Sequence, residues 1–151
     1  MHATEGNYNT AIGLPLTLLQ LSQVHTASMM EMGAKQLGDI AELCDSANPT
    51  HGIITNIAPA HLEGFGSIET VAETKGALFK KLNNGVSFVN AADHRVNALE
   101  VNGESLSFGL KPECDFPADL QHEDDGTINL TIDHQEILTY SVNLTLSKNV
   151  I

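Results

Sequence analysis

The chain has 151 residues and a net charge of −12, with 42% hydrophobic and 17% charged residues. It is long enough for one domain with a buried core, and this composition excludes wholesale disorder. The negative charge argues against a nucleic-acid-binding surface, which needs clustered Lys and Arg, and no apolar run approaches the roughly 18 residues of a membrane span.

Helix and strand patterns alternate in the first third of the chain. Residues 12–24 predict a helix, because leucines recur at helical spacing and Pro15 falls in the first turn, where proline is tolerated. The short apolar run at residues 26–32 predicts a buried strand. Residues 35–47 predict a second helix. The apolar face of that helix is expected to contain Leu37, Ile40, Ala41 and Cys44.

Two continuous apolar runs follow, at residues 51–58 and 85–91. Such runs are typical of parallel strands that are covered on both faces. Between them, residues 67–82 have the apolar spacing of an amphipathic helix. Strands separated by helices predict right-handed βαβ units, so the fold class is α/β, with a mostly parallel sheet flanked by helices.

The pattern changes beyond about residue 100. Residues 101–151 contain short alternating segments, which predict a small antiparallel β-sheet appended to the α/β body of residues 1–100. Polar residues at 123–127 and 133–136 predict hairpin turns within it. We expect both parts to belong to one domain, because the second is too short to build a substantial core alone.

The two cysteines, Cys44 and Cys114, are far apart and match neither a metal-binding nor a redox spacing. They are therefore expected to be buried and reduced. The chain does not open with the basic segment and apolar core of a secretory signal, so a cytoplasmic location is expected.

Three polar residues are candidates for a functional site. Lys75 interrupts the apolar stripe of its helix, four residues after Val71 and four before Phe79. Glu31 ends one predicted strand, and His61 lies in the loop after the next. Ligands gather beyond the carboxyl ends of parallel strands, so these groups could converge there. Spacing alone leaves other roles open: a helix cap for Glu31, a surface or core histidine, and a lysine that extends to solvent.

Longer motifs resemble a known family. The segments "TEGNYNTAIGLPLTLLQL", "MEMGAKQLGDIAEL", "GIITNIAPAHLEGFGSIETVAETKGALF" and "GVSFVNAAD" are similar to the central ATPase domain of the Mur ligases, over about residues 3 to 93. Within the family, they most resemble the enzymes that add D-Ala-D-Ala to UDP-N-acetylmuramoyl-tripeptide (UDP-MurNAc-tripeptide) in peptidoglycan synthesis. The resemblance implies an ATP-dependent ligase that works through an acyl phosphate.

The resemblance also implies roles for the three candidate residues. Lys75 matches a lysine that reacts with carbon dioxide to form a carbamate, which bridges metal ions. Glu31 and His61 match ligands of two Mg2+ ions. Burial favours the neutral amine that attacks carbon dioxide, and Mg2+ prefers oxygen-rich coordination, so the implied chemistry is physically consistent.

Four further residues match positions near the bound nucleotide and are predicted to bind it. Asn7 and Asn9 match a loop close to the phosphates and the incoming peptide. Asn90 and Asp93 match a turn at a strand end.

The chain departs from the family pattern in what it lacks. It contains no G-x-x-x-x-G-K-[ST] phosphate loop, and it resembles an excised central domain. We therefore expect no ligase activity from the isolated chain, and we expect an open sheet edge that could allow self-association. Two alternatives remain at this point: another Mur-type or folylpolyglutamate-type ligase domain, or a non-catalytic binding domain that retains the fold.

Overall fold

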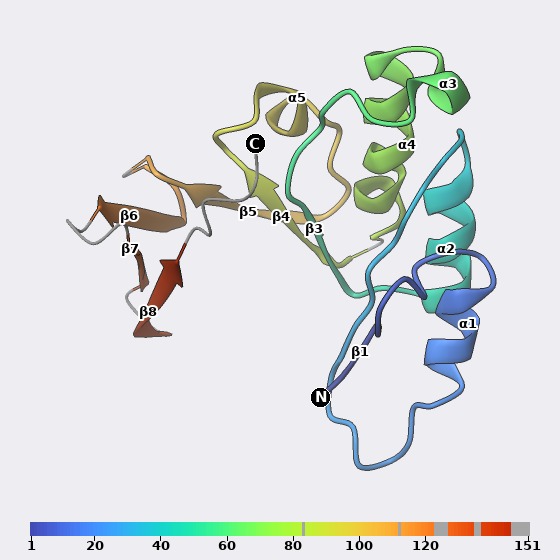
Figure 1. Ribbon diagram of the computed structural model, residues 1–151, viewed down its shortest axis with the longest axis horizontal. Helices are drawn as coiled ribbons and strands as arrows, with labels where there is room; N and C mark the ends of the chain where they lie inside the picture. Colours follow the sequence, from blue (N-terminus) through green and yellow to red (C-terminus); the bar gives the residue numbers. More distant parts are fainter. Residues whose placement is uncertain (83, 112, 123–126, 135–136, 146–151) are drawn as a thin grey trace.

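The computed structural model describes residues 1–82, 84–111, 113–122, 127–134 and 137–145 (Figure 1). Its helices are α1 (Gly13–Leu18), α2 (Asp39–Ala47), α3 (Leu62–Phe65), α4 (Ile68–Lys81) and α5 (His94–Asn97). Its strands are β1 (His2–Ala3), β2 (Ser28–Met29), β3 (His51–Ile54), β4 (Val86–Asn90), β5 (Glu104–Gly109), β6 (Phe116–His122), β7 (Thr127–His134) and β8 (Ile137–Thr145). In this part of the chain, no helix is long and apolar enough to cross a membrane.

Six strands form one sheet in the order β3-β4-β5-β6-β7-β8. The pairs from β3 to β6 are parallel, and β6, β7 and β8 pair antiparallel. Figure 1 shows β6 to β8 extending away from α1, α2 and α4. This arrangement confirms the predicted class, a mostly parallel α/β sheet with an antiparallel part near the C-terminus.

One strand beyond residue 100 differs from its prediction. Residues 104–109 were expected in the antiparallel part, but β5 pairs parallel with β4, because the chain returns through α5 before it enters the sheet. The division into residues 1–100 and 101–151 remains a prediction. The turns expected at residues 123–127 and 133–136 lie partly outside the described residues. Of the described positions, residue 127 begins β7 and residues 133 and 134 end it, so these three lie in a strand.

The predictions of fully buried strands for β2 and β3 were wrong. β2 has only two residues and pairs with β1 in a separate parallel sheet, and Met29 is 62% exposed. In β3, Ile54 is buried while Ile53 is 55% exposed. Leu78 on α4 and Leu82, just after the helix, cover one face of β3 so closely that a Cβ at Gly52 would lie 2.9 Å from Leu78 and 2.8 Å from Leu82. The strand is therefore packed on one face and open on the other.

Helix α4 confirms the helical pattern of residues 67–82. The hydroxyl of Ser67 accepts a hydrogen bond from the Thr70 amide and caps the N-terminus. Val71 and Phe79 face inward, and Leu82 follows at the end of the helix, so the apolar stripe packs against the sheet. The main core contains Ile54, Ile57, Phe65, Val71, Phe79, Leu82, Val89 and Val96.

Helix α2 begins later than the sequence pattern predicted. Gly38 adopts a left-handed φ of 97° immediately before the helix, which only glycine adopts without strain. Leu37 therefore lies outside the helix and is exposed, whereas the expected Ile40 and Cys44 are buried. Leu43 completes the buried face of α2.

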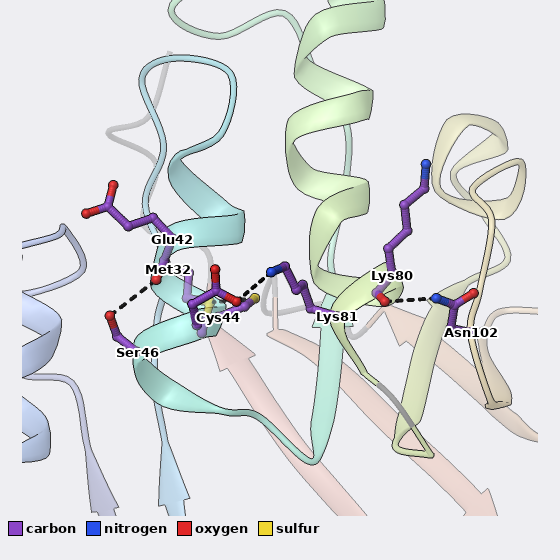
Figure 2. A network of polar contacts seen from close by, with 8 residues as sticks. Met32, Glu42, Cys44, Ser46, Lys80, Lys81 and Asn102 are labelled. Atoms are coloured by element: carbon purple, nitrogen blue, oxygen red, sulfur yellow. Dashed lines mark hydrogen bonds and ion pairs between the residues drawn. The ribbon is translucent and has the colours of Figure 1, made fainter.

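Helices α2 and α4 are also joined by polar contacts, which Figure 2 shows from close by. Asp45 on α2 forms an ion pair with Lys81 on α4. Deeper in the same region, the Cys44 thiol contacts the Met32 sulfur at 3.8 Å. Both cysteines are free and buried, as the sequence predicted.

The burial of Cys44 leads to a test of its reactivity. Burial raises the pKa of the thiol to about 11, although the Lys81 charge acts in the opposite direction. At pH 8 about one thiol in a thousand is then the reactive thiolate. We expect iodoacetamide to label Cys44 far more slowly in the native chain than in urea, as measured by mass spectrometry of the Cys44 peptide. Equal rates in the two conditions would contradict this prediction.

Candidate functional site

The site lies where the chain leaves β3, in a segment that we call the β3 exit (residues 55–57). Two polar residues at the end of β4 hold it. The Asn90 side-chain amide donates to the Thr55 carbonyl at 2.6 Å, and a carboxylate oxygen of Asp93 accepts from the Ile57 amide at 2.9 Å. These contacts fix the backbone at the carboxyl ends of two neighbouring parallel strands, where α/β proteins bind their ligands.

Lys75 contacts the same segment from helix α4. Its ammonium donates to the Asn56 carbonyl at 2.8 Å, and the side chain is half-buried. Burial lowers the pKa of Lys75, while the nearby Asp93 carboxylate acts in the opposite direction. The lysine therefore directs a partly desolvated amine at the strand end, as its place between Val71 and Phe79 predicted.

Asp93 also begins helix α5. Its second carboxylate oxygen accepts from the amides of Arg95 at 2.9 Å and Val96 at 3.1 Å. The hydrogen bond from Ile57 is the largest cause of a lowered Asp93 pKa, and the two bonds within α5 add to it. The one carboxylate thus links the β3 exit to the turn after β4.

Replacing Asp93 by Ala is expected to lower the free energy of unfolding by about 2–4 kcal/mol, because one helix cap and one further amide lose their acceptor. Since the folded-state pKa is lowered, the carboxylate stabilises the fold fully above pH about 4 and loses this effect as the pH falls through the folded value. Urea unfolding between pH 2 and 7 measures both effects.

Asp93→Asn is the matched control for this test. It keeps one oxygen acceptor and removes the titrating group, so its loss should be smaller than that of Asp93→Ala. Its stability should also vary less with pH below 4. A pH dependence identical to that of the unchanged chain would contradict the role given to Asp93.

Glu31 and Asn9 form a second part of the site. The Asn9 side-chain amide donates to the Glu31 carboxylate at 2.8 Å, and the Asn9 carbonyl accepts from the Gly33 amide at 2.7 Å. A Cβ at Gly33 would lie 3.0 Å from the Asn9 side chain, so the glycine allows this close approach. Glu31 is exposed, two residues beyond the end of β2, and Asn7 lies in the exposed turn before Asn9.

His61 lies at the start of α3, with an exposed side chain and a left-handed φ of 51°. The helix after it packs tightly on a neighbouring segment, because a Cβ at Gly64 would lie 2.3 Å from the Lys35 carbonyl. The Gly64 amide donates to the His61 carbonyl at 2.9 Å, so this contact holds the turn that begins at His61 against the Lys35 backbone.

His61 and Asn9 share a pocket of about 390 Å³, which we call the α2 pocket. Its lining comprises Asn9, Thr10, Ala11, Gly33, Ala34, Lys35, Asp39, Glu42, Leu43 and His61. Asn9 connects this pocket to Glu31, whereas Lys75, Asn90 and Asp93 do not line it. Six of the predicted residues thus fall into two groups: Lys75, Asn90 and Asp93 at the β3 exit, and His61, Asn9 and the Asn9-bonded Glu31 at the α2 pocket. Asn7 lies in neither group.

The residues that the structure describes contain no group of three or more His, Cys, Asp or Glu that could hold a metal ion. The predicted set includes only two such residues, Glu31 and His61, and its third member is a lysine. The metal-ligand and nucleotide-binding roles therefore remain predictions. Sequence reasoning did not find the charged residues of the α2 pocket, although Lys35, Asp39 and Glu42 cluster around two glycines in "GAKQLGDIAEL".

Comparison with known proteins shows a clear relationship. Residues 1–151 match the Mur ligase middle domain. The UDP-N-acetylmuramoyl-tripeptide--D-alanyl-D-alanine ligase of Haemophilus influenzae is 42% identical over 108 residues, which are 70% of this chain and 24% of that protein. The Escherichia coli ligase of the same name is 43% identical over 120 residues, 76% of this chain and 26% of that protein. The chain thus spans about a quarter of the length of these relatives.

Solved structures agree with the sequence relatives. A crystal structure of MurF from Acinetobacter baumannii superposes with a TM-score of 0.78 at 25% identity, covering 96% of this chain and 32% of that one. MurF ligase from Thermotoga maritima, in complex with ADP, superposes with a TM-score of 0.77 at 29% identity, covering 95% of this chain and 34% of that one. The similarity extends over nearly all of the present chain.

Proposed function

Since this chain belongs to the Mur ligase family, matching its middle domain, we propose that it is part of an ATP-dependent ligase that joins D-Ala-D-Ala to UDP-MurNAc-tripeptide. The Haemophilus influenzae and Escherichia coli relatives of that name align over 70% and 76% of the chain. The ADP bound by the Thermotoga maritima protein supports a nucleotide as co-substrate. A role in peptidoglycan synthesis and a cytoplasmic location belong to the same proposal.

The observation that carries the proposal is the set of contacts around the β3 exit. Lys75 comes from α4, and Asn90 and Asp93 come from the end of β4, yet each bonds to one of three consecutive residues. A half-buried lysine that is directed at a strand end, with its pKa lowered by burial, is a candidate for a functional residue. The arrangement favours catalysis over a domain that only binds a partner.

In the proposed reaction, the terminal carboxylate of the tripeptide attacks the γ-phosphorus of ATP, and ADP leaves. The amine of D-Ala-D-Ala then attacks the acyl phosphate carbon, inorganic phosphate leaves, and a proton is lost from the new amide nitrogen. The first step brings two negatively charged groups together, and in the second step negative charge develops on the carbonyl oxygen and the departing phosphate. A chain of net charge −12 therefore needs a local source of positive charge to perform them.

Mg2+ would supply that charge. The types of donor suit it on one condition, although Lys75 lies at the β3 exit and Glu31 and His61 lie at the α2 pocket. Glu31 offers a carboxylate, with one oxygen already accepting from Asn9, and the His61 imidazole has no hydrogen-bonded partner among the described side chains. Lys75 offers oxygen ligands only after its amine has added carbon dioxide to form a carbamate. When bound, the metal ions would neutralise the phosphate and carboxylate charges as these approach.

A segment exchange tests the proposed function. The aligned part of the Escherichia coli relative is replaced by this chain, and the same exchange with the Haemophilus influenzae segment serves as the control. We expect the first chimera to form product only when ATP, UDP-MurNAc-tripeptide and D-Ala-D-Ala are all present, and we expect the isolated chain to form none. An inert chimera beside an active control would refute the proposal.

A further inference from the structure

Helix α1 is apolar on two opposite faces. Leu14 and Thr17 on the inner face are 0% and 2% exposed, so this face packs into the fold. Along the outer face, Ile12 just before the helix, Leu16 within it and Leu19 just after it are 78%, 47% and 81% exposed. We call these three residues the α1 stripe. A helix that is apolar all round is normally covered on every side, so the stripe is an apolar surface suited to a partner.

The loop after α1 adds a further exposed apolar side chain, Val24, and is held in place. His2 on β1 fastens it, because its Nε2 donates to the Thr17 carbonyl at 2.9 Å and its ring packs against the ring of His25, with centroids 5.0 Å apart. Nδ1 of His25 accepts from the Ser22 amide at 3.1 Å. The backbone around the α1 stripe is therefore fixed, which lowers the entropy cost of binding.

The segment that carries the α1 stripe has no formal charge. Residues 6–30 contain no Asp, Glu, Lys or Arg, so the net charge of −12 comes entirely from the rest of the chain. Figure 1 shows α1 beside α2, at the end of the molecule opposite β6 to β8. None of the three stripe residues lines the α2 pocket. The stripe is thus separate from the candidate site.

Charge decides which partner fits this surface. A partner with charged residues would have to bury them unpaired, because residues 6–30 offer no counter-charge. A second copy of the chain brings the same uncharged surface, so no charge is buried when the two stripes meet. Contacts elsewhere would bring together surfaces of two chains that each carry a charge of −12, which repel each other.

We propose that the α1 stripe is the contact between two copies of this chain, related by a two-fold axis near Leu16. With the two helices antiparallel, Ile12 of one copy packs against Leu19 of the other. These residues lie on one face, about 10 Å apart along the helix, so both pairs form at once. The proposal does not rest on the ligase activity. It places self-association at a helix, whereas the sequence suggested an open sheet edge.

Sedimentation equilibrium of the purified chain between 5 and 500 µM tests whether the contact forms. We expect a dimer with a Kd on the order of 100 µM, because the surface is small. The Kd should fall severalfold between 50 and 500 mM NaCl, since salt screens the repulsion between the two chains and does not weaken apolar contacts. At about 10 µM or below, most of the chain is then monomeric, with Leu19 exposed.

A chain that stays monomeric at 500 µM in both salt concentrations would overturn the proposal. The α1 stripe would then be a surface for another part of the ligase or for a different protein. A dimer that weakens as salt is added would also contradict it, because ion pairs would then hold the two copies together.

Two lysine variants locate the contact. Leu19→Lys should raise the Kd at least tenfold, because each lysine would be buried against the second copy without a counter-charge. Ile53→Lys is the matched control, since Ile53 is 55% exposed on β3, at the edge of the six-stranded sheet, and the change in charge is the same. Its Kd should stay within twofold of the original. The opposite result would place the contact at the sheet edge and overturn the proposal.

A dilution series of the ¹⁵N-labelled chain locates the contact without any substitution. We expect the amide signals of residues 12–24 to shift between 20 and 500 µM, and those of β3 and β4 to stay constant. Concentration-dependent shifts confined to β3 and β4 would refute the assignment to the α1 stripe.

Discussion

Replacing Phe79 by Ala is expected to lower the free energy of unfolding by about 3–5 kcal/mol, the largest effect on stability that we predict. The Phe79 side chain is 0% exposed, in the middle of the main core between α4 and the sheet. Truncation of Phe79 removes a large apolar surface from the core and leaves a cavity. Helix α4 is held at both ends, so it cannot move inward to fill this cavity. Since domains of this size are stable by about 5–15 kcal/mol, a large part of the stability would be lost.

Urea unfolding followed by circular dichroism measures this loss. Leu19→Ala is the control, because Leu19 is 81% exposed at the end of α1 and its truncation should change the stability by about 0.5 kcal/mol or less. A loss below about 1 kcal/mol for Phe79→Ala would mean that the core between α4 and the sheet is not packed as described.

The sequence predicted the fold best where local signals and burial agree. Helix α4 has a serine cap, a continuous apolar stripe and two lysines in its last turn, and its observed bounds lie within one residue of the prediction. Strand β4 is likewise a short apolar run, and its side chains alternate between buried and half-buried. In both cases the residues that set the local structure are also the residues that pack.

The failures arise where packing depends on distant partners. The apolar run around β2 has no local feature that tells a buried strand from an exposed one, and Met29 is exposed because β2 pairs only with the short β1. The direction of β5 is equally non-local, since alternation indicates a strand but not whether its neighbour is parallel. Leu37 was wrongly predicted to lie on the buried face of α2, and here the reason is local. Gly38 adopts a left-handed conformation just before the helix, which the spacing of apolar residues does not reveal.

The candidate site was predicted in part for the same reasons. The place of Lys75 on the apolar stripe predicted that its amine would point toward the end of a strand, where it reaches Asn56. The identity of that partner could not be predicted, because a backbone carbonyl leaves no mark in the sequence. The α2 pocket forms from four separate segments of the chain, at residues 9–11, 33–35, 39–43 and 61, so neither its shape nor its charges follow from spacing.

Replacing Lys75 by Ala in the active chimera is expected to reduce product formation by about a hundredfold or more, the largest functional effect that we predict. The proposed carbamate supplies oxygen ligands that the chain otherwise lacks at this position, and Ala removes them. A short carboxylic acid such as acetate can occupy the vacated space, so it should restore part of the activity. Steady-state release of inorganic phosphate measures both effects.

Lys75→Arg separates the carbamate from a simple hydrogen bond. Arginine keeps the positive charge and can donate to the Asn56 carbonyl, but it stays protonated and cannot add carbon dioxide. We therefore expect Lys75→Arg to be as inactive as Lys75→Ala. Lys80→Ala, which removes an exposed lysine from the same helix, should remain active. High activity in Lys75→Arg would show that the lysine acts as a cation, and the carbamate would then have no part in the reaction.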